Sequence, residues 1–279
     1  MIIAKAHAKI NWALNITGFR EDGYHLLDML MQAIELHDHM TFEADEDILL
    51  TVDGIVPEDA EKNLVVRAAR ALNAHCGTTR GARIALEKHI PARAGLGGGS
   101  ADCALTLRVL NEMWGLNLPN EILLALGAKL GADVPFCLAG GLARVTGIGE
   151  HIEPIPDPPE IPLVLVTPGG GLSTAEVFRL WDAGGFPPVA LDTPALADAV
   201  IRRDFNAIDR LCANALTAPA VQLMPGIDVI LREMRRLGAR TAFMTGSGST
   251  VVGAFDDPDA ARIATGAFEN AVLTHTHPA

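Results

Sequence analysis

A glycine-rich segment, residues 91–101, has the residue types of a phosphate-binding loop. It consists of Pro91, Ala92, Arg93, Ala94, Gly95, Leu96, Gly97, Gly98, Gly99, Ser100 and Ala101. It runs directly into residues 101–114, whose apolar positions have helical spacing. Glycine lets consecutive N–H groups turn inward, and a helix N-terminus adds unpaired N–H groups and a positive dipole end. Ser100 is placed to cap this helix, to donate to a phosphate or to reach a metal ion.

The segment differs from the two common phosphate-binding fingerprints. No Gly-Lys-Ser or Gly-Lys-Thr occurs in the chain, which excludes a Walker A loop. Ser100 stands where a dinucleotide fingerprint has its third glycine. Three consecutive glycines together with Gly95 exceed what a tight turn requires. The sequence therefore favours a polyphosphate-binding loop of another kind over a plain strand-to-helix turn.

Two further segments have side chains suited to chemistry. Asp133 lies in the sequence Gly-Ala-Asp-Val-Pro-Phe, where an aspartate serves equally well as a helix N-cap, as a turn residue or as a catalytic base. Residues 245–250 read Thr-Gly-Ser-Gly-Ser-Thr. That pattern fits either a second loop near phosphates or a hairpin turn between strands.

The first predicted strand presents a lysine and an asparagine on its polar face. Apolar and polar residues alternate from residue 6 to residue 16, so one face should be buried and the other exposed. Lys9, Asn11 and His7 share the polar face. Lys9 is therefore either an exposed charge or a group that meets a substrate.

Metal-ligand patterns are weak. His37 with His39, and His275 with His277, are close in sequence, but neither pair has a recognised carboxylate or cysteine partner, and no HExxH motif is present. The sequence predicts surface histidines and no metal centre. No GxSxG motif occurs either, so a hydrolase serine is unsupported.

The elements that must position these residues follow from periodicity. Further strands are expected at 34–43, 83–89, 140–146, 163–167, 241–244 and 251–255, and helices at 63–75, 101–114, 120–130, 191–203, 207–211 and 227–237. Five prolines between residues 154 and 162 resist both helix and central strand and predict a domain boundary. Because strands and helices cluster rather than alternate regularly, the expected class is α+β.

Composition excludes several functional classes. The chain has 279 residues, 49% of them hydrophobic, and a formal net charge of −12, which argues against general nucleic-acid binding. An anionic substrate then needs a locally positive or amide-lined site. The 4 cysteines lack CxxC spacing and are expected to be reduced. The N-terminus does not resemble a signal peptide and no stretch resembles a membrane helix, so a cytoplasmic protein without a membrane partner is expected.

Taken in order along the chain, these motifs resemble the GHMP kinases. The resemblance rests on Lys9-Ile10-Asn11, Gly23-Tyr24-His25, the glycine-rich segment, Gly131–Phe136 and Gly246-Ser247-Gly248. The glycine-rich segment alone marks only the superfamily, and Tyr24-His25 with Asp133-Val134-Pro135-Phe136 narrows it to members that act on a cytidine-diphosphate-linked alcohol. The chain departs from the usual pattern at Ala92-Arg93-Ala94, where glycines are common, and at Ala101, where a second serine is common.

The resemblance implies a fold and an activity. It implies an N-terminal domain of the ribosomal protein S5 domain 2 type at residues 1–156, an α+β domain at 157–279, and an active-site cleft between them. ATP with Mg²⁺ would lie over the glycine-rich segment. The reaction would be ATP-dependent phosphorylation of the 2-hydroxyl of a cytidine-diphosphate-linked methylerythritol, a step of mevalonate-independent isoprenoid synthesis, by a monomer or homodimer.

It also implies roles for individual residues. Asp133 would be the general base and Lys9 its charged partner. Asn11, Tyr24, His25, Thr174 and Phe178 would lie at the substrate, with Tyr24 and Phe178 stacking on cytosine; for Phe178, a core position in an amphipathic helix is an equal alternative. Competing interpretations are a kinase of the same superfamily acting on homoserine, mevalonate or a sugar, a decarboxylase of that fold, and a non-catalytic nucleotide-binding module.

Overall fold

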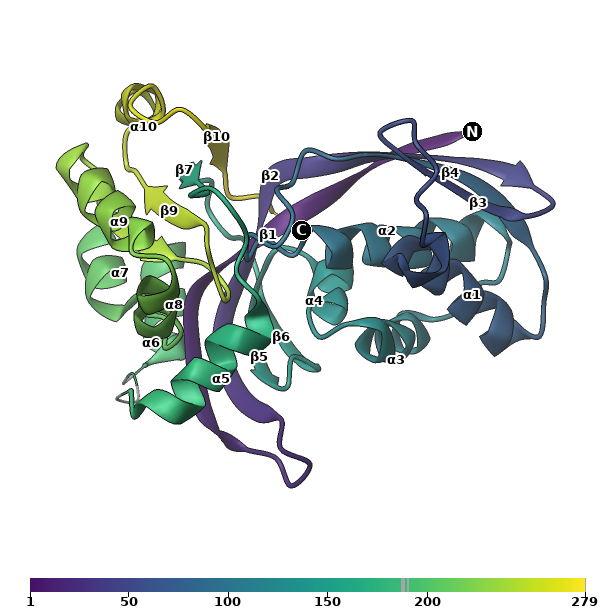
Figure 1. The fold of residues 1–279 in the computed structure, drawn as a ribbon, viewed down its shortest axis with the longest axis horizontal. Helices are drawn as coiled ribbons and strands as arrows, with labels where there is room; N and C mark the ends of the chain where they lie inside the picture. The colour runs from purple at the N-terminus through teal and green to yellow at the C-terminus, as the bar shows by residue number, and fades with distance from the viewer. Residues whose placement is uncertain (187–188, 190, 279) are drawn as a thin grey trace. The chain divides into compact units, whose positions relative to one another are not determined.

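Two compact units make up the chain in a computed structural model that describes residues 1–186, 189 and 191–278 (Figure 1). Unit 1 consists of Met1–Ala8, Leu36–Ile90 and Gly97–Ala139. Unit 2 consists of Lys9–Glu35, Pro91–Leu96 and the described residues from Gly140 onward. The units alternate along the chain because the two long strands β1 (Ile2–Phe19) and β2 (His25–Asp45) contribute to both. The predicted boundary between residues 156 and 157 lies inside unit 2, and stays a prediction about the family's two domains.

Unit 1 packs four helices against a small sheet. Its remaining elements are β3 (Ile48–Val52), a short 3-10 turn η1 (Ala60–Lys62), α1 (Leu64–Cys76), β4 (Gly81–Glu87), α2 (Gly98–Met113), α3 (Asn120–Leu130) and α4 (Val134–Ala139). The second half of β2 pairs antiparallel with β4, and β3 pairs parallel with β4. Alternate residues of β2 and β4, such as Phe42 and Ile84, face α1 and α2 in the core. Helix α2 contacts α1, α3 and α4 and is the central helix of this unit.

Unit 2 contains a second, fully antiparallel sheet. Its elements are β5 (Leu142–Gly147), β6 (His151–Ile155), β7 (Pro162–Val166), α5 (Thr174–Gly184), α6 (Thr193–Ile201), α7 (Phe205–Leu211), α8 (Thr217–Leu223), α9 (Gly226–Arg236), β8 (Thr241–Met244), β9 (Val251–Ala254), α10 (Pro258–Thr265) and β10 (Ala271–His275). The strand order is β10-β7-β9-β8, and every residue of β7, β8 and β9 is buried. The first half of β2 pairs with β5, which pairs with β6.

The expected long strands and helices are confirmed, and short elements were missed. The sequence did not predict β3, β6, β10, α4, α8 or α10, and it gave α5 only as the amphipathic helix that was one alternative for Phe178. The proline-rich stretch, expected to resist helix and central strand, has a strand at each of its two ends. Pro154 lies in β6, which is an edge strand, and Pro162 is the first residue of β7. Both are places where a missing N–H is tolerated.

The cysteines lie apart from one another in the structure. All 4 cysteines are free, and burial raises the pKa of the Cys103 thiol to about 12, so this thiol is unreactive at neutral pH. Among the described residues, no helix is long and apolar enough to cross a membrane.

Candidate active site

The glycine-rich segment contributes to both units, and its second part forms the start of α2. Gly97 is the N-cap of α2 and has a φ of 71°, in the left-handed region that favours glycine. No side chain caps this 16-residue helix, so its first N–H groups are not engaged by a cap. The N-terminus of α2 therefore has the donors and the dipole of an anion site.

The structure corrects the expectation that all the glycines form a loop before the helix. Helix α2 begins at Gly98, not at Ala101, so Gly98 and Gly99 belong to its first turn. At Gly98 a Cβ would lie 3.0 Å from Ile90 Cγ2, whereas at Gly99 the nearest atom would be 3.7 Å away. Position 98 requires glycine because Ile90 packs closely against it. Position 97 requires glycine because its backbone has a positive φ.

Within unit 1, the start of α2 lies beside the Asp133 segment. Ser100, in the first turn of α2, places its Oγ 3.7 Å from the position of a Cβ built on Gly131. Asp133 follows two residues later and directly precedes α4, with its carbonyl accepting from the Cys137 N–H. Asp133 is half-buried. It therefore has the backbone position of a helix N-cap, and its carboxylate comes from a segment next to the start of α2.

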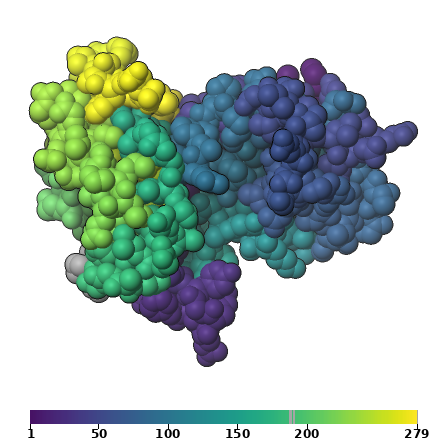
Figure 2. Space-filling view, viewed as in Figure 1, coloured from purple at the N-terminus to yellow at the C-terminus, as the bar shows by residue number. Residues whose placement is uncertain are grey.

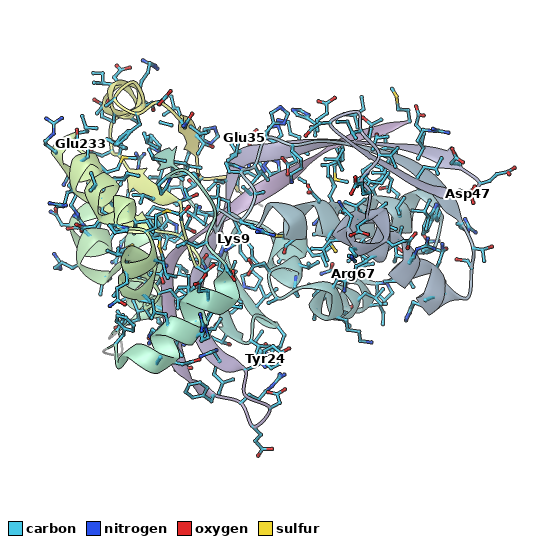
Figure 3. All side chains as sticks on the ribbon, viewed as in Figure 1. Lys9, Tyr24, Glu35, Asp47, Arg67 and Glu233 are labelled. Carbon is cyan, nitrogen blue, oxygen red and sulfur yellow. The ribbon has the colours of Figure 1, made fainter. Side chains whose placement is uncertain are left out.

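Lys9 and Asn11 are buried, which corrects the expected exposed face of the first strand. Their exposed fractions are 4% and 1%, and β1 is buried on both faces from Ala8 to Ala13. Lys9 Nζ donates to Asn11 Oδ1 at 2.8 Å, and the Asn11 N–H donates to Thr245 Oγ1 at 2.9 Å. Figure 3 labels Lys9 on its strand. A lysine is almost never this buried without a partner or a function.

The Thr245–Thr250 segment is the turn between β8 and β9, and it contacts the first part of the glycine-rich segment. The Thr250 N–H donates to the Ala94 carbonyl at 3.2 Å. A Cβ on Gly95, whose φ is 78°, would lie 2.3 Å from the Thr245 carbonyl oxygen. The hairpin turn between strands is confirmed, and a place near phosphates stays a prediction. Its close approach also explains why position 95 requires glycine.

Two residues hold this turn; Asn214 was not found from the sequence, and Thr174 was expected at the substrate. Asn214 donates through Nδ2 to the carbonyls of Met244 and Gly246, both at 2.8 Å. Thr174, the first residue of α5, shares a 2.8 Å hydrogen bond with Ser247. Asn214 has no motif of its own, and its partners lie 30 or more positions away in sequence. Only the fold could identify it.

An aromatic group in unit 2 surrounds His25. The centroid of the imidazole lies 4.6 Å from that of Phe178, 4.9 Å from that of Phe19 and 5.9 Å from that of Trp181. Figure 2 shows the purple end of the β1–β2 hairpin beside the green surface of α5, the two elements that supply these rings. His25 and Phe178, both expected at the substrate, thus lie side by side. Phe19 and Trp181 were missed because they have no motif.

Tyr24 lies at the exposed end of the β1–β2 hairpin, where Figure 3 labels it. Its exposed fraction is 59%, and the Arg20 guanidinium lies 5.2 Å from the centre of its ring. Phe178 is half-buried, while Val177 is the residue of α5 that is fully buried. Phe178 is therefore not a pure core residue, and its ring is partly accessible.

A buried charge cluster supports the start of α2 in unit 1. Lys88 forms ion pairs with Asp38 and, at 2.8 Å, with Asp102 of α2. Asp38 also accepts from the backbone N–H groups of His89 and Ile90. Burial by itself lowers the pKa of the Lys88 ammonium, but Asp102 and Asp38 outweigh it and the pKa is raised. The cluster ties the segment after β4 to the helix that begins at Gly98.

Asp102 gives folding stability a specific pH dependence. Burial raises the pKa of its carboxyl from 3.8 to about 7, although Lys88 opposes the shift. The folded protein therefore binds more protons than the unfolded chain between about pH 4 and pH 7, so this contribution to stability falls as the pH rises through that window. We therefore compare the free energies of unfolding of the wild type and of Asp102→Asn. We expect the wild-type value minus the variant value to fall as the pH rises from about 4 to 7. Denaturant titrations of both proteins at several pH values measure it, and a constant difference would contradict the assignment.

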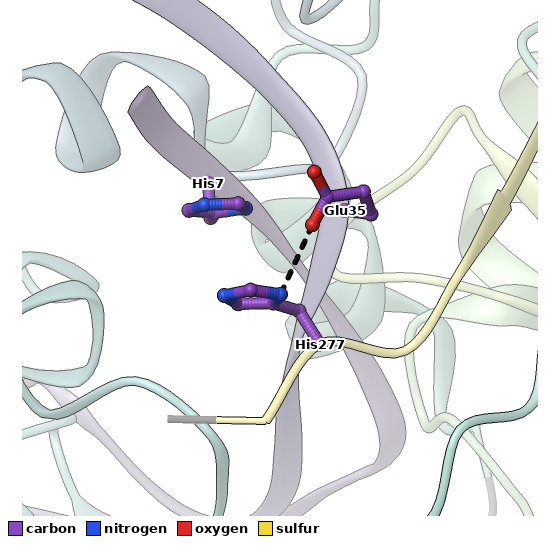
Figure 4. A group of neighbouring side chains, drawn as sticks. All are labelled: His7, Glu35 and His277. Carbon is purple, nitrogen blue, oxygen red and sulfur yellow. Dashed lines mark ion pairs between the residues drawn. The ribbon is translucent and has the colours of Figure 1, made fainter. Parts of the chain in front are cut away.

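The histidines expected at the surface have partners in the structure. His277 Nδ1 lies 3.0 Å from Glu35 Oε2, an ion pair within unit 2 when the imidazole is protonated (Figure 4). His275 Nδ1 lies 3.1 Å from the Thr276 carbonyl. In unit 1 the rings of His37 and His39 meet edge to face at 4.8 Å. Sequence spacing suggested His275 and His277 as a possible pair of metal ligands. In the structure, His277 instead contacts the Glu35 carboxylate.

Two family models match the chain. The model of the GHMP kinases N terminal domain matches residues 63–141, and the model of the GHMP kinases C terminal matches residues 196–273. Both lie within the two domains expected from the sequence. The first match contains the start of α2 and Asp133.

Individual proteins match over nearly the whole chain. A 4-diphosphocytidyl-2-C-methyl-D-erythritol kinase of Pelotomaculum thermopropionicum is 44% identical over 264 residues, which are 94% of this chain and 92% of that protein. One of Bacillus subtilis is 38% identical and covers 90% of this chain and 87% of its own length.

Solved structures agree. A crystal structure of a 4-(cytidine 5'-diphospho)-2C-methyl-D-erythritol kinase has a TM-score of 0.85 at 34% identity, with 100% of both chains covered. A homoserine kinase from Cytophaga hutchinsonii has a TM-score of 0.72 at 18% identity, covering 98% of this chain and 95% of that one, and indicates a shared fold alone. The expected α+β GHMP kinase fold is confirmed. The chain belongs to the GHMP kinases and, within them, to the 4-diphosphocytidyl-2-C-methyl-D-erythritol kinase family.

Proposed function

We propose that this protein transfers the γ-phosphoryl group of ATP to the 2-hydroxyl of 4-diphosphocytidyl-2-C-methyl-D-erythritol. The observation that carries the proposal is the neighbourhood, within unit 1, of the α2 N-terminus and the Asp133 segment. Phosphoryl transfer needs a phosphate held in place and a group that accepts the proton of the attacking alcohol. The identity of the alcohol substrate is taken from the names of the relatives. The expectations of a cytoplasmic monomer or homodimer, without a nucleic-acid or membrane partner, belong to the same proposal.

The N-terminus of α2 fits the phosphates of ATP. Gly97 turns the backbone into the helix, and the following N–H groups have no side-chain cap. An anion bound there meets donors that need no rearrangement. The Ser100 hydroxyl, in the first turn of α2, would offer Mg²⁺ one oxygen ligand beside the phosphate oxygens of ATP, so the donors at this helix start fit the ion. When bound, Mg²⁺ would neutralise charge on the phosphates.

Asp133 is assigned as the general base. The 2-hydroxyl of the substrate is a tertiary alcohol and a very weak acid, so a carboxylate must take its proton while the oxygen–phosphorus bond forms and ADP leaves. Lys9 supplies positive charge that stabilises negative charge developing in this reaction. Asn11 holds the Lys9 ammonium at 2.8 Å and so fixes its position.

The aromatic group around His25 is assigned to the cytosine end of the substrate. A base can stack on Phe178, with Tyr24 on its other face, because every nucleobase has a π-face. Thr174, the first residue of α5, is assigned to the same end of the substrate. Since the whole protein has a net charge of −12, long-range attraction does not bring in a diphosphate, and recognition must come from such short-range contacts.

Removing the Phe178 ring should weaken binding of the cytidine substrate without weakening binding of ATP. We expect Phe178→Ala to raise the KM for the cytidine substrate by about one to two decades, since base stacking contributes roughly 1–3 kcal/mol. The KM for ATP should stay nearly unchanged. Phe268→Ala is the matched control, because Phe268 is also half-buried in unit 2 and lies outside the aromatic group. Equal KM values for the two variants would remove Phe178 from the substrate site.

One experiment separates this function from its rivals. ADP release is measured with a panel containing 4-diphosphocytidyl-2-C-methyl-D-erythritol, homoserine, mevalonate and a sugar. The proposal expects fast release with the first alone. Fast release with another alcohol would favour a different small-molecule kinase, and no release with any would favour a nucleotide-binding module.

A further inference from the structure

We propose that Asp182 is a positioning residue that makes the enzyme prefer cytosine to uracil, because it fixes which ring nitrogen of His25 carries the proton. The inference rests on the proposed function, in which His25 contacts the edge of the pyrimidine. It concerns a residue that no sequence motif singles out. Asp182 lies in the last turn of α5, and His25 is the first residue of β2.

The two side chains are in direct contact. Asp182 Oδ1 lies 2.8 Å from His25 Nε2, although 157 positions separate the residues in sequence. Phe178, Phe19 and Trp181 surround the same imidazole, so the ring is held in place by packing as well as by the hydrogen bond. The exposed fraction of the His25 side chain is 16%, against 42% for Asp182. The imidazole is therefore well enclosed but still reaches the surface.

The contact determines the tautomer of the neutral imidazole. An ionised carboxylate can only accept hydrogen bonds, so Nε2 must carry the hydrogen that Asp182 receives. In a neutral imidazole the other nitrogen, Nδ1, then has a lone pair and accepts. Among the residues that the structure describes, Asp182 is the one hydrogen-bond partner found for this ring. Nδ1 thus remains an acceptor for a ligand.

An acceptor at this place distinguishes the two pyrimidines. Cytosine has an exocyclic amino group, a donor, at the position where uracil has a carbonyl oxygen, an acceptor. Nδ1 of His25 can accept from the amino group of cytosine. Against uracil, two acceptors would face each other with no hydrogen between them. A site with a fixed acceptor therefore rejects the uridine analogue, as polar sites reject ligands that leave their groups unpaired.

Asp182→Asn tests this role with almost no change of shape. The carboxamide can donate to Nε2, which allows the tautomer with hydrogen on Nδ1, a donor that suits uracil. We expect the ratio of kcat/KM for the cytidine-linked over the uridine-linked substrate to fall roughly tenfold or more, the effect of losing one base-edge hydrogen bond. Glu176→Gln is the control. It removes one negative charge from the same helix, and the ratio should not change.

A purely structural role would change the rate with both substrates and leave the ratio constant. Because the carboxamide oxygen of Asp182→Asn can also accept from Nε2, Asp182→Leu, which can neither donate nor accept, is measured beside it, and an unchanged ratio in both variants overturns the proposal. His25→Ala then locates the error: if this variant loses the cytosine preference, the proposed function stands and only the role of Asp182 fails. If His25→Ala also keeps the preference, the imidazole does not read the base, and that part of the proposed function fails as well.

A measurement on the wild-type protein gives an independent test. Nitrogen-15 NMR of labelled histidine distinguishes the two neutral tautomers by the shifts of the ring nitrogens. We expect His25, identified by its loss in His25→Ala, to carry its hydrogen on Nε2 at pH 8. Hydrogen on Nδ1 would overturn the proposal even if the Asp182→Asn protein did not fold.

Discussion

Asp133→Asn is expected to lower kcat about 10²–10⁴-fold while leaving the KM for ATP nearly unchanged. This is the usual contribution of a general base, and the amide cannot take the proton of the alcohol. The substitution keeps the shape of the side chain, and the backbone contact from Cys137 to the Asp133 carbonyl is not altered. Folding should therefore be preserved. Steady-state ADP release with saturating ATP and cytidine substrate measures the effect.

Asp47→Asn is the control for this prediction. Asp47 is exposed, lies in unit 1 between β2 and β3, and is labelled in Figure 3. The control removes one carboxylate from the same unit and should keep wild-type turnover. If Asp133→Asn turned over as fast as this control, Asp133 would not be the base.

Gly97→Ala should weaken ATP binding by about tenfold or more. The φ of Gly97 is 71°, and a Cβ in this left-handed region costs about 1–2 kcal/mol. Part of that strain is relieved when the backbone moves, and movement turns the first N–H groups of α2 away from the phosphates. Titration with ATP or a non-hydrolysable analogue gives the dissociation constant directly, without turnover.

Gly115→Ala separates strain from binding. Gly115 follows the C-terminal end of the same helix, has a φ of 62°, and a Cβ there would meet nothing within 4 Å. Both variants should lose comparable thermal stability, but Gly115→Ala should bind ATP normally. Equal ATP affinity in the two variants would mean that Gly97 serves only to start the helix.

Sequence periodicity located the long elements but misjudged the burial of β1. Alternation correctly placed Ile10 and Trp12 in the core. It also placed Lys9 and Asn11 at the surface, because a period of two cannot show that the second face is covered. That face is covered by residues more than 200 positions later, such as Thr245. Such a partner becomes visible only when the chain has folded.

Residues of the candidate site that stand in a sequence motif were found from the sequence. Residues whose role depends on contacts with distant parts of the chain were missed. The glycine-rich segment, Asp133, His25 and Phe178 stand in recognisable sequences. Asp182 and Asn214 do not, because each acts through one hydrogen-bond pattern set by the fold. The Lys88 cluster was missed for the same reason: Lys88 and Asp38 lie 50 positions apart in sequence, and both read as ordinary charges.

The start of helix α2 could not be predicted accurately from the sequence. The sequence placed its start at Ala101 because glycine is a poor helix former. In the structure Gly98 and Gly99 are helical, and packing against Ile90 accounts for the first of them. Tertiary contact here outweighs intrinsic propensity.

The most direct test of the central claim compares the cytidine substrate with the same alcohol lacking its nucleotide. Purified enzyme is given ATP and either 4-diphosphocytidyl-2-C-methyl-D-erythritol or methylerythritol phosphate, and kcat/KM is measured by ADP release. We predict a value at least 10²-fold lower for the truncated compound, because it cannot use the stacking and edge contacts that we assign to the aromatic group. Equal values for both compounds would contradict the account, because the enzyme would then not recognise cytidine.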